Sequence, residues 1–473
     1  MKKLIVVRHG QSLGNALGVI QGNNSGGGLT DVGKQQIISN TNNNIELLKQ
    51  AEKIVTSPYL RALETAKEIS KISGLNITID DRLHEMDAGI LAGLPKIEAK
   101  NEYPEYYKIW KNRLDLDGIP NAEKGAHLQA RILAFLLNYY EKEDFCDVLV
   151  THAGFIRCLI NTIEGRQRTN QFNIENGAFF ELDDIFKMIN IEQRKRAMNS
   201  RVFIIDTLDG KYVAKIKQGK ITKQDESEKQ LLDQLPYNNI PTILAMQSFD
   251  NGNYCKILKY VKGVHKYGKL NTSEYIALIN SEKFFENLFS RVKNGSFRTI
   301  DLIEKLDGIL NTTKNDYVKS EVEELLKSPK RTLIQDKQKY VLSHDDMNRD
   351  NILFEELEDG SVKANIIDYE SLEYAPKDFQ FASMLACGLL LEDEPIETII
   401  ETVKSRDKNL ETIFYFMQIR LIEGLYFFND NSNPYVRINK EMSKKLSKKY
   451  FIANEILKRE KNKSKGDVEK YGD

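Results

Sequence analysis

Three short apolar runs constrain the fold of the first third of this chain more strongly than any other sequence feature. They span residues 4–7, 54–57 and 148–151, and a helix-like stretch follows each run. A short run without polar alternation is typical of a strand that is buried on both faces of a sheet. Strands that alternate with helices at this spacing predict a parallel-rich α/β sheet.

Side chains that can bind or transfer phosphate follow these predicted strands. They are Arg8 and His9 after the first strand, Arg61 beyond the second and His152 after the third. Because ligands of a parallel sheet collect at the carboxyl ends of its strands, these residues are candidates for one site. A histidine can accept a phosphoryl group on a ring nitrogen while arginines hold the phosphate oxygens. Glu85 is a candidate proton donor to the leaving alkoxide.

The sequence around these residues resembles the histidine phosphatase superfamily, which has the phosphoglycerate-mutase-like fold. The resemblance covers about residues 1–182. Its blocks, in chain order, are Arg8-His9-Gly10-Gln11-Ser12 with Asn15, Gln21-Gly22, Leu29-Thr30-x-x-Gly33, Ser57-Pro58-x-x-Arg61-Ala62-x-x-Thr65-Ala66, Leu83-x-Glu85-x-x-x-Gly89-x-x-x-Gly93 and Thr151-His152-Ala153-Gly154.

This resemblance implies a three-layer α/β/α domain and a role for each candidate residue. His9 would be the phosphorylated nucleophile, and Glu85 would be the acid/base. The phosphate pocket would be completed by Arg8, Arg61 and His152, with Asn15 assisting. No cofactor is implied for this domain.

Two reactions are compatible with the first domain: hydrolysis of a phosphate monoester and a mutase reaction. Gln21-Gly22 and the short domain favour hydrolysis, and the mutase is the alternative. The Gly-Glu-Ser block that the family usually carries before its last helix is not evident, and residues 121–125 stand near its place. Contacts to the distal part of the substrate are therefore not predicted.

The sequence pattern restarts after about residue 195. Residues 201–207 and 211–216 are predicted to be two strands joined by a turn at Asp209-Gly210, and residues 225–235 a helix that ends near Pro236. The chain is predicted to be mostly helical from about residue 271. These changes predict domains at 1–195 and 196–457, each large enough to fold alone. The polar segment 458–473 is predicted to be a disordered tail.

Oxygen-bearing side chains between short apolar strands form a second candidate site. Asn351 follows Asp346 by five residues, and Asp368 comes seventeen residues later. Carboxylate and amide oxygens suit Mg²⁺ beside nucleotide phosphates. The pattern His344-x-Asp346-x-x-x-x-Asn351, followed by a strand and Ile366-Ile367-Asp368, resembles the aminoglycoside phosphotransferase and choline kinase superfamily, which has the bilobed protein-kinase-like (α+β) fold.

Upstream segments extend this second resemblance over about residues 198–390. Residues 210–216 resemble the strand that carries the nucleotide-binding lysine, and residues 259–263 resemble the interlobe hinge. The first hairpin lacks the glycine-rich loop of protein kinases. The resemblance assigns a role to each polar position: Asp346 would accept the substrate hydroxyl proton, Asn351 and Asp368 would hold Mg²⁺, Lys215 would grip the phosphates of ATP or GTP, Glu228 would pair with Lys215, and Asp378 would brace the catalytic loop. Lys217, on the same strand face, is the alternative to Lys215.

Together these features predict a bifunctional enzyme. The first domain would hydrolyse phosphate monoesters through a phosphohistidine without a metal, and the second would use Mg-ATP to phosphorylate a small-molecule hydroxyl. The alternative is a phosphatase or mutase that is regulated by a catalytically inactive kinase-like domain, which would sense a nucleotide or another ligand.

Composition excludes other classes of function. The 68 Lys+Arg and 69 Asp+Glu leave a net charge of -1, which argues against nucleic-acid binding through phosphate attraction. No apolar run reaches the roughly 18–20 residues that a spanning helix needs. The four cysteines lie far apart, without the spacing of a zinc site or a disulfide framework. Small-molecule metabolites are the expected partners and the cytoplasm is the expected location.

Overall fold

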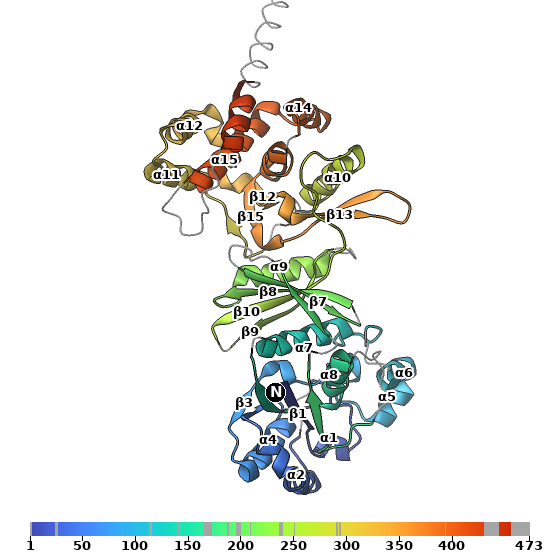
Figure 1. Ribbon diagram of the computed structural model, residues 1–473. Helices are drawn as coiled ribbons and strands as arrows, with labels where there is room; N and C mark the ends of the chain where they lie inside the picture. Colours follow the sequence, from blue (N-terminus) through green and yellow to red (C-terminus); the bar gives the residue numbers. More distant parts are fainter. Residues whose placement is uncertain are drawn as a thin grey trace, which may run out of the picture. The chain divides into compact units, whose positions relative to one another are not determined.

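The computed structural model divides the chain into two units, shown in Figure 1. Unit 1 comprises residues 1–221 and 242–260, and unit 2 comprises residues 222–241 and 261–473. The residues that the structure describes are 2–23, 27–112, 116–140, 142–164, 173–186, 189–194, 200–208, 210–235, 240–249, 251–289, 292, 295–392, 394–429 and 444–455.

A five-stranded sheet forms the centre of the first part of unit 1, with the order β3-β2-β4-β1-β5. Its strands are β1 (Lys2–Arg8), β2 (Lys53–Thr56), β3 (Ile77–Ile79), β4 (Phe145–Thr151) and β5 (Phe179–Asp183). Strands β1 to β4 pair in parallel, and β5 pairs antiparallel to β1 at one edge. The three predicted strands are confirmed, and they are the three neighbours β2, β4 and β1.

Helices cover both faces of this sheet. They are α1 (Leu13–Ala16), α2 (Asp31–Asn43), α3 (Ile45–Leu48), α4 (Leu60–Ser73), α5 (Lys96–Glu102), α6 (Pro104–Asn112), α7 (Gly125–Tyr140) and α8 (Ala153–Glu164). Alternate residues of β1 enter different cores: Ile5 and Val7 pack with residues of α2 and α4, whereas Leu4 and Val6 pack with residues of α7 and α8. A strand buried on both faces needs an unbroken apolar run, which explains the sequence pattern.

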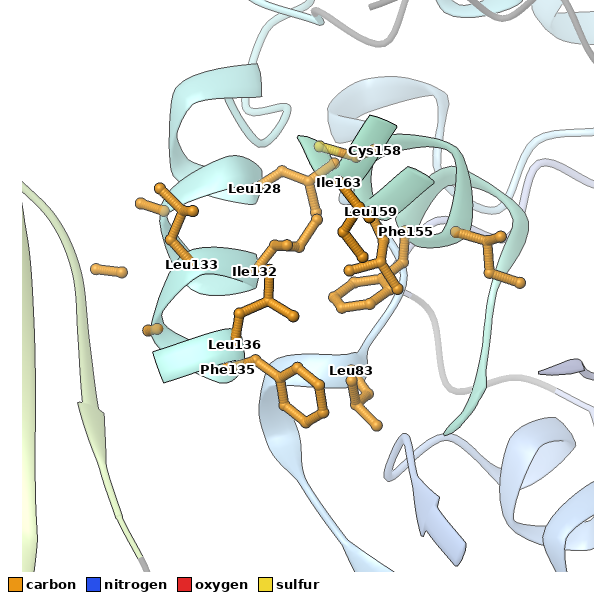
Figure 2. Packing of buried hydrophobic residues seen from close by; sticks show 14 of the residues in the cluster. Leu83, Leu128, Ile132, Leu133, Phe135, Leu136, Phe155, Cys158, Leu159 and Ile163 are labelled. Carbon is orange, nitrogen blue, oxygen red and sulfur yellow. The ribbon is translucent and has the colours of Figure 1, made fainter. Parts of the chain in front are cut away.

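Helix α7 is mostly apolar and is buried on several sides along most of its length. Figure 2 shows Leu128, Ile132 and Leu136 of α7 facing Phe155 and Leu159 of α8, while Leu133 lies on the other side of α7. A helix that is hydrophobic all round must be covered from more than one direction. The second cover comes from later in the chain.

A second five-stranded sheet provides this cover, with the order β6-β7-β8-β10-β9. Its strands, all antiparallel, are β6 (Asn190–Gln193), β7 (Ser200–Thr207), β8 (Gly210–Gln218), β9 (Ile243–Ser248) and β10 (Asn253–Lys259). Apolar side chains of this sheet join one hydrophobic core with α7, and Figure 1 shows α7 between the two sheets. The two predicted strands are confirmed as β7 and β8; Asp209 of their turn lies outside the described residues.

The contacts therefore group the second sheet with unit 1. The predicted boundary at residue 195 lies outside the described residues, and a division at that residue stays a prediction. The sequence analysis placed this division without knowing that strands after residue 195 cover one side of α7.

Unit 2 is mostly helical, as predicted. Its helices are α9 (Lys223–Gln234), α10 (Thr272–Phe289), α11 (Leu302–Thr312), α12 (Asp316–Lys327), α13 (Phe379–Ser383), α14 (Ile396–Ser405) and α15 (Leu410–Asn429). Its strands are β11 (Arg298–Thr299), β12 (Tyr340–His344), β13 (Ile352–Glu356), β14 (Val362–Ile366) and β15 (Leu372–Pro376), arranged as the sheet β11-β15-β12 and the hairpin β13-β14.

The helix predicted at 225–235 is α9, while Pro236 and the predicted tail lie outside the described residues. Within the part of the chain that the structure describes, no helix is long and apolar enough to cross a membrane.

Candidate functional site

The carboxyl ends of β1, β4 and β2 bring three predicted residues together in unit 1. His9 and His152 follow β1 and β4, and their ring centroids are 5.2 Å apart. Arg61 lies in the first turn of α4, which follows β2. All three side chains are buried, with exposed fractions of 3% or less.

Hydrogen bonds define which ring nitrogen of each histidine carries a proton. Nδ1 of His9 lies 2.8 Å from the Gly10 carbonyl oxygen, which can only accept, so Nδ1 is protonated and Nε2 keeps its lone pair. Nδ1 of His152 accepts from Nε of Arg61 at 3.2 Å. Nε2 of His152 therefore holds the proton and donates to the Ser57 hydroxyl at 2.8 Å.

Burial keeps both histidines uncharged. It is the main reason that the pKa of His9 lies well below its ordinary value, and the positive charges of Arg61 and Arg8 lower that pKa further. The pKa of His152 is lowered by the same causes in the same order, burial and then Arg61. A neutral imidazole with a free Nε2 is the form that attacks phosphorus.

Three arginines belong to the same site as His9. The pKa of Arg8 is lowered to about 10, mainly by burial, so Arg8 stays charged at neutral pH; Glu85 acts to raise this pKa, and repulsion from Arg157 and Arg61 acts to lower it. Arg61 donates from Nη2 to the Gly22 carbonyl oxygen at 3.2 Å, and Arg8 donates from Nη1 to the carbonyl oxygen of Ile174. Guanidinium groups close enough to repel one another favour the binding of an anion between them.

Glu85 reaches the same site from the segment after β3. Its carboxylate accepts backbone N–H groups from Gly154 and Phe155 at the start of α8, both at 3.1 Å. A Cβ atom on Gly154 would lie 2.6 Å from Oε1 of Glu85, so this approach requires glycine. The contact explains why glycine follows His152-Ala153 in the sequence.

Asn15 is held beside His9 by a residue that the sequence analysis missed. Asn176 donates from Nδ2 to Oδ1 of Asn15 at 2.9 Å and to the carbonyl oxygen of His9 at 3.3 Å. Asn176 precedes Gly177, whose φ of +74° marks a turn before β5. An Asn-Gly pair signals the turn in the sequence, but its place beside His9 depends on the antiparallel pairing of β5 with β1, which was not predicted.

These side chains open into a cavity of about 400 Å³. Arg8, His9, Asn15, Arg61 and Glu85 all line it. Its outer wall includes further residues that the sequence analysis did not identify: Lys96, Tyr107, Trp110, Lys111 and Arg157. The cavity can therefore hold a phosphate group against His9 and has room for an organic group beside that phosphate.

The second candidate site lies in unit 2, in the loop after β12. Asn351 donates from Nδ2 to Oδ2 of Asp346 at 3.0 Å, and Asn348 donates from Nδ2 to Oδ1 at 2.7 Å. Because the amide nitrogen of Asn351 serves Asp346, its carbonyl oxygen is the atom left to bind a cation. The structure thus joins two of the residues that the sequence predicted and adds Asn348.

Asp368 follows β14 and is linked to the same loop through the backbone. Ile367 donates its N–H to the Asn351 carbonyl oxygen at 2.8 Å, and His344 donates from Nε2 to the Ile367 carbonyl oxygen at 3.2 Å. Asp368 has a φ of +65°, a left-handed conformation that is uncommon for a residue other than glycine. Such strain persists where the surrounding structure imposes it, and it concentrates at functional sites.

Polar side chains from later in the chain lie near this loop. Asp378 pairs with Lys408 at 2.6 Å, and its role as the brace stays a prediction. Gln380, two residues later, accepts the backbone N–H of His344 at 2.9 Å through Oε1. Arg420 of α15 adds a bond from Nη2 to the Asp345 carbonyl oxygen at 2.9 Å.

The predicted nucleotide-binding pair is divided between the units. Lys215 lies on β8 in unit 1, where it is in register with Val202 and Lys256, and Glu228 is buried on α9 in unit 2. The alternative, Lys217, is on the same face of β8 as Lys215. The pairing of Lys215 with Glu228 stays a prediction.

The predicted magnesium ligands, Asn351 and Asp368, supply one amide oxygen and one carboxylate. Among the described residues, no group of three or more His, Cys, Asp or Glu side chains is arranged to hold a metal ion. Mg²⁺ commonly takes only one or two protein ligands and completes its shell with water and substrate phosphates. The two residues fit that kind of site.

Comparison with known proteins identifies the first part of the chain. The model of the histidine phosphatase superfamily (branch 1) matches residues 4–184. A probable phosphoglycerate mutase GpmB of Yersinia enterocolitica is 31% identical over 172 residues, which are 35% of this chain and 76% of that protein. A putative phosphoserine phosphatase 2 of Hydrogenobacter thermophilus is 27% identical over 186 residues, 38% of this chain and 89% of that protein.

A solved structure of a phosphoserine phosphatase mutant from Entamoeba histolytica, in complex with phosphoserine, is 26% identical. The match covers 38% of this chain and 90% of the chain in that structure, with a TM-score of 0.32. The family match ends at residue 184. The kinase-like resemblance of the later residues stays a prediction.

Proposed function

The chain belongs to the histidine phosphatase superfamily through residues 4–184, and we propose that unit 1 hydrolyses phosphate monoesters of small metabolites through a phosphohistidine at His9. The family supports a phosphatase or mutase enzyme. The observation that carries the finer proposal is the hydrogen bond from Nδ1 of His9 to the Gly10 carbonyl oxygen, which leaves Nε2 unprotonated in a site that contains the buried Arg61.

The first step forms a bond between Nε2 of His9 and the phosphorus atom. The ester P–O bond breaks, its electron pair leaves with the alkoxide oxygen, and Glu85 in its acid form gives that oxygen a proton. Arg8 and Arg61 hold the phosphoryl oxygens while negative charge develops on those oxygens. His152 contributes by accepting from Nε of Arg61, which fixes the direction of the guanidinium group.

The second step returns the enzyme to its starting state. Water attacks the phosphorus atom, Glu85 takes the proton of that water, and the P–N bond breaks with its electron pair returning to Nε2. Inorganic phosphate leaves. A mutase would instead pass the phosphoryl group to a second hydroxyl of the substrate, so water access at this step separates the two reactions.

The substitution His9→Ala tests this proposal. We expect phosphate release from p-nitrophenyl phosphate to fall by several orders of magnitude. The variant loses the whole covalent pathway, which costs far more than the loss of a single hydrogen bond. Phosphate release from 3-phosphoglycerate, measured beside its conversion to the 2-isomer, distinguishes the phosphatase from the mutase. Activity retained in His9→Ala would refute the phosphohistidine.

We further propose that unit 2 transfers phosphate from Mg-ATP to a hydroxyl group of a small molecule. The fixed carboxylate of Asp346, held by Asn348 and Asn351, supports a role as the base that accepts the hydroxyl proton. Asn351 and Asp368 would hold Mg²⁺, which would neutralise charge on the transferred group.

The substitution Asp346→Asn tests the second proposal, because it keeps the shape of the side chain and removes the base. We expect ATP consumption to fall at least a hundredfold while ATP still binds. Nucleotide binding without turnover in the unmodified chain would favour the alternative, a kinase-like domain that senses a ligand and regulates the phosphatase.

A further inference from the structure

A buried ion pair lies beside the segment that carries Glu85, and no step of the proposed reactions uses it. Arg131 of α7 and Glu123, two residues before α7, share two hydrogen bonds: Nε of Arg131 donates to Oε1 at 2.9 Å, and Nη2 donates to Oε2 at 2.8 Å. The two side chains are only 4% and 14% exposed. Neither is among the described residues that line the cavity at His9, so the pair is not part of the wall that would contact a substrate.

Arg131 holds the backbone that precedes Glu85. Its Nη1 atom donates to the carbonyl oxygens of Arg82 and His84, at 2.7 and 3.0 Å. One nitrogen thus binds two carbonyl groups of the same short segment, so the position of the segment follows the orientation of the guanidinium group. The two bonds to Glu123 fix that orientation, because the guanidinium group is planar and its donors have fixed directions.

The pair also contacts the chain on the other side of Glu85. The backbone N–H of Glu123 donates to the Asp87 carbonyl oxygen at 3.0 Å. The guanidinium carbon of Arg131 lies 5.4 Å from the centroid of the Phe155 ring, and the backbone N–H of Phe155 binds Oε1 of Glu85 at 3.1 Å. Residues before and after Glu85, and one residue that binds its carboxylate, are therefore all in contact with this pair.

Stability alone gives little reason for a buried ion pair at this position. Moving two charges out of water is costly, and replacement of such a pair by apolar side chains is often neutral or stabilising. The hydrogen bonds of the Arg131 side chain described above go either to Glu123 or to the segment of Glu85. This arrangement indicates a role in positioning that segment.

We propose that Arg131 and Glu123 are positioning residues of the phosphatase reaction, which keep the Glu85 carboxyl group at the leaving oxygen of the ester. The inference rests on the proposed function of unit 1. Because Arg8 and Arg61 hold the phosphoryl group, loss of the pair impairs proton transfer to the leaving group and spares phosphate binding. The size of the effect depends on how much the leaving group needs a proton.

Two esters of similar shape separate these effects. Phenol is a much weaker acid than p-nitrophenol, so phenolate needs a proton donor to leave more than p-nitrophenolate does. The kcat/KM of each ester covers the steps up to release of the phenol product. We call kcat/KM for p-nitrophenyl phosphate divided by that for phenyl phosphate the ester ratio. In Glu85→Gln, the reference variant, the ester ratio of the full chain should rise at least about tenfold.

The single variants of the pair should reproduce this signature. Arg131→Lys keeps the charge but cannot span the four acceptor atoms that the guanidinium group binds. We expect its ester ratio to rise at least about fivefold, with the Ki of inorganic phosphate as a competitive inhibitor unchanged within about twofold. Glu123→Gln is a milder change, and its ester ratio should rise in the same direction.

Tyr139→Phe is the matched control for a purely structural effect. It removes a buried hydrogen bond of 2.9 Å from the same helix, between the Tyr139 hydroxyl and Asp147. This variant should unfold at lower urea concentration and keep the ester ratio of the unmodified chain. A merely structural role of the ion pair would give the same result in Arg131→Lys.

A double variant separates positioning from folding. Arg131→Met combined with Glu123→Met should unfold at higher urea concentration than Arg131→Met alone, because no buried charge is left without its partner. Its ester ratio should nevertheless stay raised. An ester ratio that returns to normal with the regained stability overturns the inference, and so does a normal ratio in both Arg131→Lys and Glu123→Gln.

Two further outcomes would contradict the account at different points. A rise in the Ki of phosphate as large as the loss of kcat/KM in Arg131→Lys would mean that the pair shapes the phosphate pocket, which overturns its role toward Glu85. An unchanged ester ratio in Glu85→Gln would refute the acid role of Glu85 in the proposed function, and the inference with it. A raised ratio in Glu85→Gln with normal ratios in the variants of the pair would overturn the inference alone.

Discussion

The two candidate sites meet the charge of a phosphoryl group in opposite ways. The site in unit 1 combines Arg8 and Arg61 with neutral histidines, and its proposed nucleophile is a nitrogen. The site in unit 2 presents the oxygens of Asp346, Asn351 and Asp368. Fixed guanidinium groups neutralise phosphate oxygens without help, whereas carboxylates repel them unless a cation lies between. Under the two proposed functions, the first site carries its own positive charge and the second takes it from a metal ion.

Removal of divalent metal gives the largest expected contrast between the two sites. EDTA should abolish ATP-dependent phosphorylation and leave phosphate release from p-nitrophenyl phosphate unchanged, and Mg²⁺ should restore the lost activity. Asp368→Ala should reproduce the effect of EDTA even in excess Mg²⁺, because it removes a ligand. The comparison breaks down if a chelator stops both reactions to the same extent.

The cationic character of the first site is tested by Arg61→Gln. We expect kcat/KM for p-nitrophenyl phosphate to fall about 10²–10³-fold, as when one preorganised donor to transition-state charge is removed. Arg194→Gln, at an arginine whose side chain is 55% exposed, is the matched control and should have no effect. Loss of activity below tenfold in Arg61→Gln would mean that Arg61 does not hold the phosphoryl group.

The independence of unit 1 depends on the sheet that covers α7. A fragment of residues 1–195 should be less stable than a fragment of residues 1–260 by at least about 3 kcal/mol, since each large apolar side chain that is uncovered costs about 1.5–3 kcal/mol. Urea unfolding followed by the fluorescence of Trp110, the one tryptophan of the chain, measures the difference. Equal stabilities would show that the second sheet is not part of the core of unit 1.

Acid should destabilise unit 1 through its buried histidines. Their pKa values are lowered by burial, so below about pH 6.5, the ordinary histidine value, the unfolded chain takes up protons that the folded chain does not. Stability is therefore full above that pH and falls as the pH drops. At pH 5.5 His9 should account for a loss on the order of 1 kcal/mol. The free energy of unfolding can be measured at pH 8 and pH 5.5 by urea unfolding, followed by Trp110 fluorescence. Its difference between the two pH values should be smaller by that amount in His9→Gln than in the unmodified chain. An equal difference in both chains would contradict the low pKa of His9.

The part of the site that sequence reasoning found is the part encoded locally. Apolar runs define β1, β2 and β4. His9 directly follows β1 and His152 directly follows β4. The two histidines therefore come together because β1 and β4 are neighbouring strands. Asn176 and Arg157 were missed, because each reaches the site from an element whose position depends on tertiary pairing: the turn before β5 and the second turn of α8.

Two other features were beyond the sequence pattern for physical reasons. The many apolar residues of α7 indicate burial but do not identify the element that covers them, which here is a sheet from later in the chain. Asp378 and Gln380 are both polar residues near the start of α13, and only the hydrogen bond to His344 shows that Gln380 holds the loop.

The most direct test of the account is the chemical nature of the phosphoenzyme. The full chain, quenched during turnover of a ³²P-labelled phosphate monoester, should carry label that is stable to base and lost in acid, as a phosphohistidine is. Peptide mapping should place that label at His9, and the His9→Ala chain should carry none. Label that is stable in acid and lost in base, or label that persists in His9→Ala, would contradict the assignment of a nitrogen nucleophile to this site.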